Sequence, residues 1–222
     1  MTAAALKSRP LPDYTKGEEL ANSISHLAGV AVGVFALITC LSYSNDPISV
    51  ASSVIYGISI ILLYLVSGIY HGLSPKMLMT KQVFRNLDHC TIYVLIAGTY
   101  TPVLLNIMYR ETPTKALAIL AGIWAAALFG IIFTAIDLEK YSKLSMFCYI
   151  ALGWFAIFII KPIINGVGIA GVLLLVAGGV SYTVGALIYG LGKRRYMHFV
   201  FHLFVILGTL LHYICILNYV IK

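Results

Sequence analysis

Three histidines in this chain have the types and spacing of metal ligands. His198 and His202 are four residues apart near the start of one apolar segment, and His71 closes a distant one. Two histidines at positions i and i+4 of a helix share one face and can hold one ion together. Three neutral imidazoles suit zinc, because catalytic zinc sites have three protein ligands and one open position. The pattern therefore predicts a zinc site at His71, His198 and His202.

Two further polar side chains accompany these histidines. Ser67 lies four residues before His71, on the same helical face, and Asp88 opens the next apolar segment. A carboxylate beside zinc can accept a proton from a water that the ion acidifies, and a hydroxyl can donate to a developing oxyanion. We predict Asp88 and Ser67 as catalytic groups. The alternative stays open that the histidines are interfacial residues that bond neighbouring helices, as single histidines in membrane segments often do.

The composition places these groups in a membrane protein. Of the 222 residues, 60% are hydrophobic and only 10% are charged, whereas a soluble domain has about a quarter charged residues. Spans of about 20 apolar residues are needed to cross a bilayer. Seven such stretches, separated by short polar or proline-bearing loops, are expected at 22–43, 49–72, 87–108, 115–136, 144–160, 167–190 and 197–220. The sequence predicts an all-α bundle of seven transmembrane helices, with residues 18–222 as the membrane domain and 1–17 as a cytoplasmic N-terminal segment.

Basic residues in the loops predict the orientation of the bundle. The face with the N-terminus has eleven Lys and Arg residues and the opposite face has four. The eleven are Lys7, Arg9, Lys16, Lys76, Lys81, Arg85, Lys140, Lys143, Lys193, Arg194 and Arg195. The asymmetry predicts a cytoplasmic N-terminus and explains the net charge of +7 by topology and lipid headgroups. No solvated basic face for nucleic acid is expected.

On this topology the polar groups meet at one depth. The second predicted helix ends on the cytoplasmic side with His71, and the third and seventh begin there with Asp88 and His198. Ionisable groups inside a membrane are costly and are usually functional. Their common position favours a site over a set of unrelated contacts.

A stripe of polar residues at the start of the first span has two possible explanations. Glu19, Asn22 and His26 lie on one helical face. Acidic residues in a first helical turn stabilise the helix dipole, so a capping role explains the stripe as well as a functional contact does.

Other residues are expected to have supporting roles. His89 points about 100° away from Asp88 around its helix, which favours a bond to a group behind the site or to a neighbouring helix over metal binding. His212 lies ten residues after His202, about 15 Å along the helix, and is expected to bond a neighbouring helix. The cysteines are expected to be reduced and to pack as small apolar groups; they are Cys40, Cys90, Cys148 and Cys215.

Five motifs along nearly the whole chain carry a family resemblance. They are Glu-Glu-x-x-Asn-x-x-x-His at 18–26, Ser-x-x-x-His at 67–71, Leu-Asp-His at 87–89, Ala-Gly-Thr-Tyr-Thr-Pro at 97–102 and His-x-x-x-His-Leu-Phe-Val at 198–205. They resemble the bacterial hemolysin III proteins of the progestin and adipoQ receptor family. The resemblance implies seven helices with the N-terminus inside.

The same resemblance implies roles for the site residues. A zinc ion (Zn²⁺) would be held by His71, His198 and His202, Asp88 would contact the water on the zinc, and Ser67 would support the site. One departure is the apolar run Phe199–Phe201 between the paired histidines, where many relatives have a polar residue or tryptophan. This run makes the wall beside the site more apolar. Whether a substrate can reach the site is therefore an open question.

Two classes of function follow from these expectations. The first is a zinc-dependent hydrolase of a lipid amide or ester in the bacterial inner membrane, since the resemblance to alkaline ceramidases implies ceramide-type cleavage. The second is a non-catalytic regulator or sensor of membrane homeostasis with a structural zinc. A closed site without room for a substrate would favour the second. The family name associates such proteins with cytolysis, but no long amphipathic segment for inserting into a foreign membrane is present. Membrane lipids are the expected partners.

Overall fold

The computed structural model describes residues 9–190 and 194–222, and these residues form helices joined by short loops. In chain order the α-helices are α2 (Lys16–Tyr43), α3 (Pro47–Gly72), α4 (Leu78–Val103), α5 (Tyr109–Glu111), α6 (Pro113–Ile136), α7 (Ser142–Trp154), α8 (Ile160–Gly190) and α9 (Met197–Cys215). Two π-helical segments, η1 (Leu104–Met108) and η3 (Ile216–Ile221), continue α4 and α9, and a 3-10 segment, η2 (Phe155–Ile159), joins α7 to α8. Lys7 and Lys193 of the charge count lie outside the described residues.

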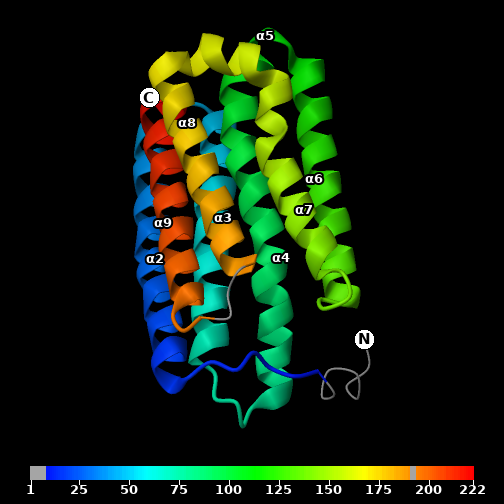
Figure 1. Cartoon of the computed structure of the whole chain (residues 1–222). Helices are drawn as coiled ribbons and strands as arrows, with labels where there is room; N and C mark the ends of the chain where they lie inside the picture. The colour runs from blue at the N-terminus through cyan, green and yellow to red at the C-terminus, as the bar shows by residue number, and fades with distance from the viewer. Residues whose placement is uncertain (1–8, 191–193) are drawn as a thin grey trace.

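Six helical runs in the described chain are long and apolar enough to cross a membrane, where seven spans were predicted. The counts differ at the run Ser142–Gly190, whose 49 residues would form a straight helix of about 74 Å, more than twice the bilayer core. This run contains two of the predicted spans. In Figure 1, α7 rises towards the end of the bundle where the C-terminus lies, and α8 returns. Gly168, with φ 66° and ψ 179°, breaks the helical backbone within α8, eight residues after its start.

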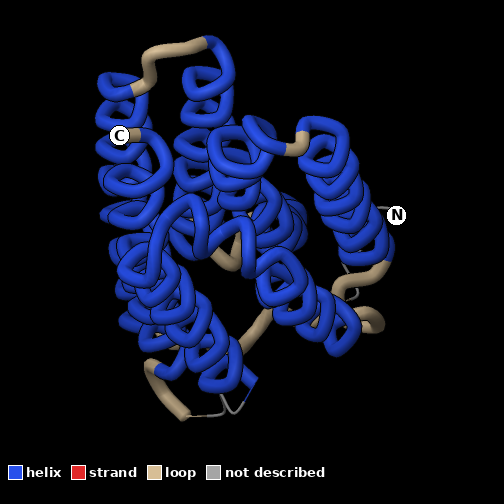
Figure 2. The backbone as a smooth tube through the Cα atoms, turned by 90° about the horizontal axis from the view of Figure 1, so that it is seen from above, coloured by secondary structure: helices blue, strands red, loops and turns tan. Residues whose placement is uncertain are grey.

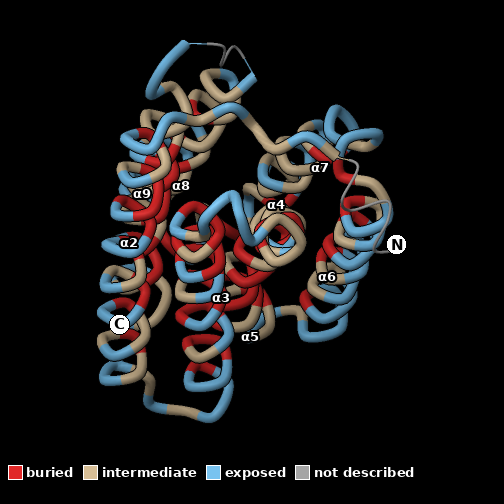
Figure 3. The backbone as a smooth tube through the Cα atoms, turned by 90° about the horizontal axis from the view of Figure 1, so that it is seen from below, coloured by how far each residue is buried: buried red, intermediate tan, exposed pale blue. Residues whose placement is uncertain are grey.

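The helices pack side by side and bury one face each. Helix α2 lies against α3 and α9, α3 lies against α4, and α8 lies against α9; Figure 2 shows the bundle end-on. Buried positions face the interior and exposed positions face outwards in Figure 3. Large apolar side chains remain on the outside, with Phe35 61% and Phe158 82% exposed. Lipid accommodates such a surface, which confirms the all-α membrane bundle.

Helix α4 begins earlier than expected, and this corrects the placement of Lys81. The helix starts at Leu78 rather than at residue 87. Lys81, assigned to a loop by the charge count, lies inside the helix and is 1% exposed. The first turns of α4 are polar, so apolar content did not reveal them. They are helical because their side chains find partners: Lys81 pairs with Glu19 and Arg85 bonds the carbonyl of Pro10.

Candidate metal centre

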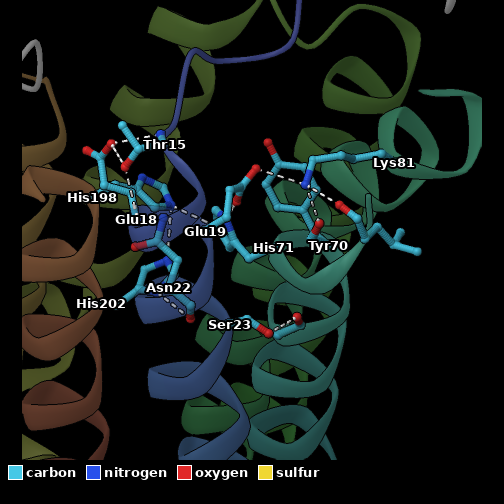
Figure 4. A network of polar contacts seen from close by, with 12 residues as sticks. Thr15, Glu18, Glu19, Asn22, Ser23, Tyr70, His71, Lys81, His198 and His202 are labelled. Carbon is cyan, nitrogen blue, oxygen red and sulfur yellow. Dashed lines mark hydrogen bonds and ion pairs between the residues drawn. The ribbon is translucent and has the colours of Figure 1, made fainter. Parts of the chain in front are cut away.

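The three predicted ligands come together at one end of the bundle. His71 lies in the last turn of α3, and His198 and His202 lie in the first turns of α9 (Figure 4). The Nε2 atom of His198 is 3.1 Å from Nε2 of His71 and 3.0 Å from Nε2 of His202. One ligand atom from each histidine lies within 4.8 Å of the others, so the group could hold a metal ion. The predicted convergence of these histidines is confirmed.

The hydrogen bonds behind the rings show that this group fits a cation. Nδ1 of His71 is 2.6 Å from a carboxylate oxygen of Glu19, and Nδ1 of His202 is 3.3 Å from the carbonyl oxygen of Asn22. Both oxygens accept hydrogen bonds, so in the neutral rings each Nδ1 carries the hydrogen and each Nε2 presents a lone pair. Both lone pairs face Nε2 of His198. A neutral His198 can carry only one hydrogen on this nitrogen, so at most one of the two lone pairs receives a hydrogen bond.

The distances agree with this conclusion. Tetrahedral zinc sites with Zn–N bonds of 2.0–2.1 Å place their nitrogens about 3.3 Å apart. The two Nε2–Nε2 separations, 3.1 and 3.0 Å, lie close to that value. A metal ion would satisfy the converging nitrogens.

The polar stripe of α2 faces this centre. Its contacts show which acidic residue caps the helix and which one contacts a histidine. Glu18 caps the helix: its carboxylate accepts from the backbone N–H of Thr15 at 2.9 Å, and its own N–H donates to the Thr15 hydroxyl. Glu19, one residue later, contacts His71 instead. The backbone carbonyl oxygen of Asn22 accepts from Nδ1 of His202. The capping explanation therefore holds for Glu18, and the contact explanation holds for Glu19.

His26 completes the stripe by stacking on a predicted ligand. Its ring lies 3.4 Å from that of His202, centroid to centroid, at an interplanar angle of 16°. The edge of Tyr64 packs 5.1 Å away. Both ring nitrogens of His26 and both side-chain polar atoms of Asn22 are buried and have no hydrogen-bond partner among the described residues. These atoms form an unsatisfied polar layer behind the metal centre.

Glu19 is held in turn by a buried lysine. Nζ of Lys81 lies 2.9 Å from the second carboxylate oxygen of Glu19. The same ammonium donates to the carbonyl oxygens of Tyr70 at 3.0 Å and Leu73 at 2.8 Å. No pattern in the sequence predicted this contact, because Glu19 and Lys81 are far apart in the chain and Lys81 was expected in a loop.

A cavity of about 260 Å³ adjoins the histidines. His198 and His202 border it together with Ser67, Asp88 and His89, and further along its wall is largely apolar, from α4, α7, α8 and α9. The Ser67 hydroxyl is buried and has no hydrogen-bond partner within the described chain. Asp88 and Ser67 thus share a cavity with His198 and His202, and neither belongs to the group that could hold a metal. Their catalytic roles stay predictions.

The remaining polar residues have structural contacts. Nε2 of His212 donates to the carbonyl oxygen of Leu175 in α8 at 2.9 Å, which confirms the predicted interhelical bond. The ring of His89 faces Tyr189, and its expected interhelical hydrogen bond stays a prediction. All four cysteines are free, and Cys90 points to the backbone of α6 rather than to the histidines.

Tyr14 covers the histidines from the end of the bundle, a contact that no spacing in the sequence indicated. Its ring lies 5.2 Å from that of His198 and 5.9 Å from that of His71. Burial raises the pKa of the Tyr14 phenol well above its ordinary value. The ring therefore faces the histidines as a neutral group.

Residues 9–14 form a strap across this end of the bundle, seen in Figure 1 as the chain that leads into α2. Gln82 donates to the carbonyl oxygen of Arg9 at 2.7 Å, and Arg85 donates to that of Pro10 at 3.0 Å. The guanidinium of Arg9 pairs with Asp137 at 3.0 Å. The strap is thus fixed to α4 and to the loop between α6 and α7.

Comparisons with known proteins agree with this architecture. The family model described as "Haemolysin-III related" matches residues 14–213. The chain is 36% identical to "Hemolysin-3 homolog" of Bacillus subtilis (strain 168) over 212 residues, 94% of this chain and 97% of that protein. It is 38% identical to "Hemolysin-3" of Bacillus cereus over 208 residues, 92% of each. It is also 27% identical to "Monocyte to macrophage differentiation factor" of Homo sapiens over 213 residues, 92% of this chain and 85% of that protein.

These matches extend from the strap to the last turns of α9 and include every predicted site residue. Together with the membrane-spanning helices, the bacterial relatives support a bacterial multi-pass membrane protein. The expected place within the progestin and adipoQ receptor family fits the same matches. The chain belongs to the haemolysin-III related family.

Proposed function

We propose that this protein is a zinc-dependent hydrolase of a lipid amide or ester. The observation that carries the proposal is the convergence of three imidazole Nε2 atoms, two of them with lone pairs directed inwards, beside a largely apolar cavity. Three imidazole ligands and an open fourth position are the arrangement of catalytic zinc. A structural zinc site is usually closed by four protein ligands.

The cavity supports a lipid substrate. Its polar end holds Asp88 and Ser67, and its walls are apolar, so an amphiphile can place its amide or ester at the histidines and its chain in the bundle. A site closed on all sides would have favoured a purely structural zinc. The room beside the ligands favours turnover.

Each group has a role in the proposed hydrolysis. Zinc, when bound, polarises a carbonyl oxygen and acidifies water. The Asp88 carboxylate accepts the proton of the attacking water and passes it to the leaving nitrogen or oxygen. The Ser67 hydroxyl, which borders the cavity together with Asp88, donates to the carbonyl oxygen as negative charge develops there.

The proposed orientation has the N-terminus in the cytoplasm of a bacterial cell, with the bundle in the inner membrane. Without Lys81, which is ion-paired inside the bundle, the basic residues still number ten against four. This bias supports the orientation. The metal centre then lies near the cytoplasmic face.

Two variants test the proposal in detergent-purified protein supplied with long-chain lipid amides and esters. Asp88→Asn should retain metal and lose about 10²–10⁴-fold of the hydrolysis rate, because it removes a general base. His202→Ala should lose both metal and activity. Asp46→Asn, a matched change of an aspartate at the far end of α3, should leave both unchanged. Wild-type turnover by Asp88→Asn would show that Asp88 is not the base.

The alternative is a regulator or sensor with a structural zinc. The burial of His71 and His202, 2% and 1% exposed, and the covering ring of Tyr14 support it. Protein that binds metal and cleaves none of these lipids would favour this function.

A further inference from the structure

A buried ion pair lies directly behind one of the proposed metal ligands. Glu19 bridges Nδ1 of His71, at 2.6 Å, and Nζ of Lys81, at 2.9 Å (Figure 4). The side chain of Lys81 is 1% exposed and that of Glu19 is 16% exposed. Burying a lysine is costly unless it is fully paired. The arrangement thus needs an explanation beyond surface charge.

We propose that Glu19 and Lys81 are positioning residues of the metal centre: Glu19 orients His71 and strengthens its Nε2 as a ligand, and Lys81 holds Glu19 in place. This inference rests on the proposed metal centre. A carboxylate that accepts the far N–H of a ligating imidazole fixes the tautomer and ring orientation and raises the basicity of the ligand nitrogen.

Lys81 fixes both the carboxylate and the helix end that carries the histidine. Its ammonium donates to the carbonyl oxygens of Tyr70 and Leu73, which lie in the last turn and at the C-cap of α3. Carbonyls at a helix C-terminus lack partners within the helix and favour a nearby cation. One lysine of α4 therefore joins the ends of α2 and α3 around His71.

The support of His71 differs from that of the other two ligands. Nδ1 of His202 lies near the carbonyl oxygen of Asn22 at 3.3 Å and the hydroxyl of Ser25 at 3.2 Å, both neutral. Nδ1 of His198 is buried without a partner among the described residues. Because only His71 is backed by a charged group, loss of Glu19 should weaken metal binding more than loss of Ser25.

Lys81 also keeps the Glu19 carboxylate from acting as a ligand itself. Both carboxylate oxygens are engaged, one by Lys81 and one by His71. Removing Lys81 alone leaves a largely buried carboxylate without its cation, which destabilises the fold. Removing both charges together avoids that penalty but still leaves His71 without its carboxylate.

A double-mutant cycle separates positioning from stability. Wild type, Glu19→Gln, Lys81→Met and the double variant are compared as full chains in detergent. Zinc affinity is measured by competition with a chelator, and the thermal unfolding midpoint is measured on metal-free protein. We expect Glu19→Gln to bind zinc about 10–100-fold more weakly. Lys81→Met should unfold at a lower temperature, and the double variant should recover the midpoint without recovering the affinity.

Two matched controls accompany the cycle. Glu18→Gln changes the neighbouring acid, which bonds Thr15 and the backbone N–H of Tyr196 and does not contact His71; it should weaken zinc binding less than Glu19→Gln does. Ser25→Ala removes a neutral group behind His202 and should weaken zinc binding less than Glu19→Gln does.

The possible failures are distinguishable. Wild-type zinc affinity in Glu19→Gln, with zinc bound by the wild type, would overturn this inference and leave the metal centre standing. Recovery of both midpoint and affinity in the double variant would mean that the pair is purely structural, which also overturns it. A wild type that binds no zinc would overturn the metal centre and this inference with it.

Discussion

The three histidines at the centre are held in different ways. His71 is fixed by a carboxylate and His202 by a backbone carbonyl. His198 has no partner for Nδ1 within the described chain and is kept in place by the rings of Tyr14 and Tyr189, 5.2 and 5.5 Å away. On the Nδ1 side, ring packing rather than a hydrogen bond therefore holds His198.

Ser67 allows a test of catalysis at the level of one atom. Its hydroxyl is buried and borders the cavity beside Asp88, so it can reach a substrate oxygen placed there. Ser67→Ala should lower the rate of lipid hydrolysis about 10²–10³-fold, the usual effect of losing an oxyanion donor. Metal content should stay the same.

The matched control for this variant is Ser59→Ala. Ser59 is buried on the same helix, and its hydroxyl donates to the carbonyl oxygen of Tyr56 in its own helix. Its replacement should leave the hydrolysis rate close to that of the wild type. Equal rates in Ser67→Ala and the wild type would exclude Ser67 as a donor to the reacting oxygen.

Helix α3 carries the site at one end and a strong cap at the other. Asp46 accepts from the backbone N–H groups of Ile48 at 2.9 Å and Ser49 at 3.1 Å. The hydrogen bond from the Ser49 N–H holds the pKa of the Asp46 carboxyl below its ordinary value. The ionised carboxylate thus stabilises the helix start, about 39 Å along the 26-residue helix from its other end.

Asp46→Ala should lower the free energy of unfolding by about 1 kcal/mol, as loss of an N-cap does. Because the folded-state pKa is depressed, this contribution is present above the ordinary carboxyl pKa and is lost as pH falls through the lowered value. The difference between the thermal midpoints of variant and wild type should be largest at neutral pH and should shrink in strong acid. Asp46→Asn, which can accept the same hydrogen bonds without a charge, should lie between the wild type and Asp46→Ala at neutral pH; a midpoint difference that did not depend on pH would contradict the charge argument.

Hydrophobic runs were sufficient to predict most of the helices. Apolar length placed the spans of α3, α6 and α9 with η3 within a few residues, and it placed the end of α2 but not its start, which lies at Lys16 rather than at residue 22. It missed the start of α4, because Lys81 and its neighbours are polar and are helical only through partners elsewhere. It also placed α7 and α8 in separate spans, whereas one continuous helical run broken at Gly168 contains both.

Helix spacing was sufficient to predict which histidines and which serine share a helical face in the candidate site. The i, i+4 pairs placed His198 with His202 and Ser67 with His71, and the alternation of spans brought both pairs to one end of the bundle. Contacts between Glu19 and Lys81, or between Tyr14 and His198, depend on how separate segments meet in three dimensions. No rule of spacing relates such residues, so the structure was needed to find them.

At the scale of the whole molecule, the polar chemistry is concentrated at the end of the bundle where α2 and α9 begin and α3 ends (Figure 1). The strap of residues 9–14 covers this end, and the cavity extends from it between largely apolar helices. A metal ion held by this histidine group would lie between the capped end of the bundle and the largely apolar cavity. The proposed function therefore depends on whether the protein binds a metal.

Elemental analysis of detergent-purified protein tests the metal centre most directly. Wild type should contain close to one zinc per chain, and His202→Ala should contain little. His212→Ala is the matched control, because it removes a histidine of the same helix that bonds α8 instead of the site, and it should keep the metal. Folded wild type that was never exposed to chelator and still contains no metal would contradict the proposed centre and the hydrolysis that depends on it.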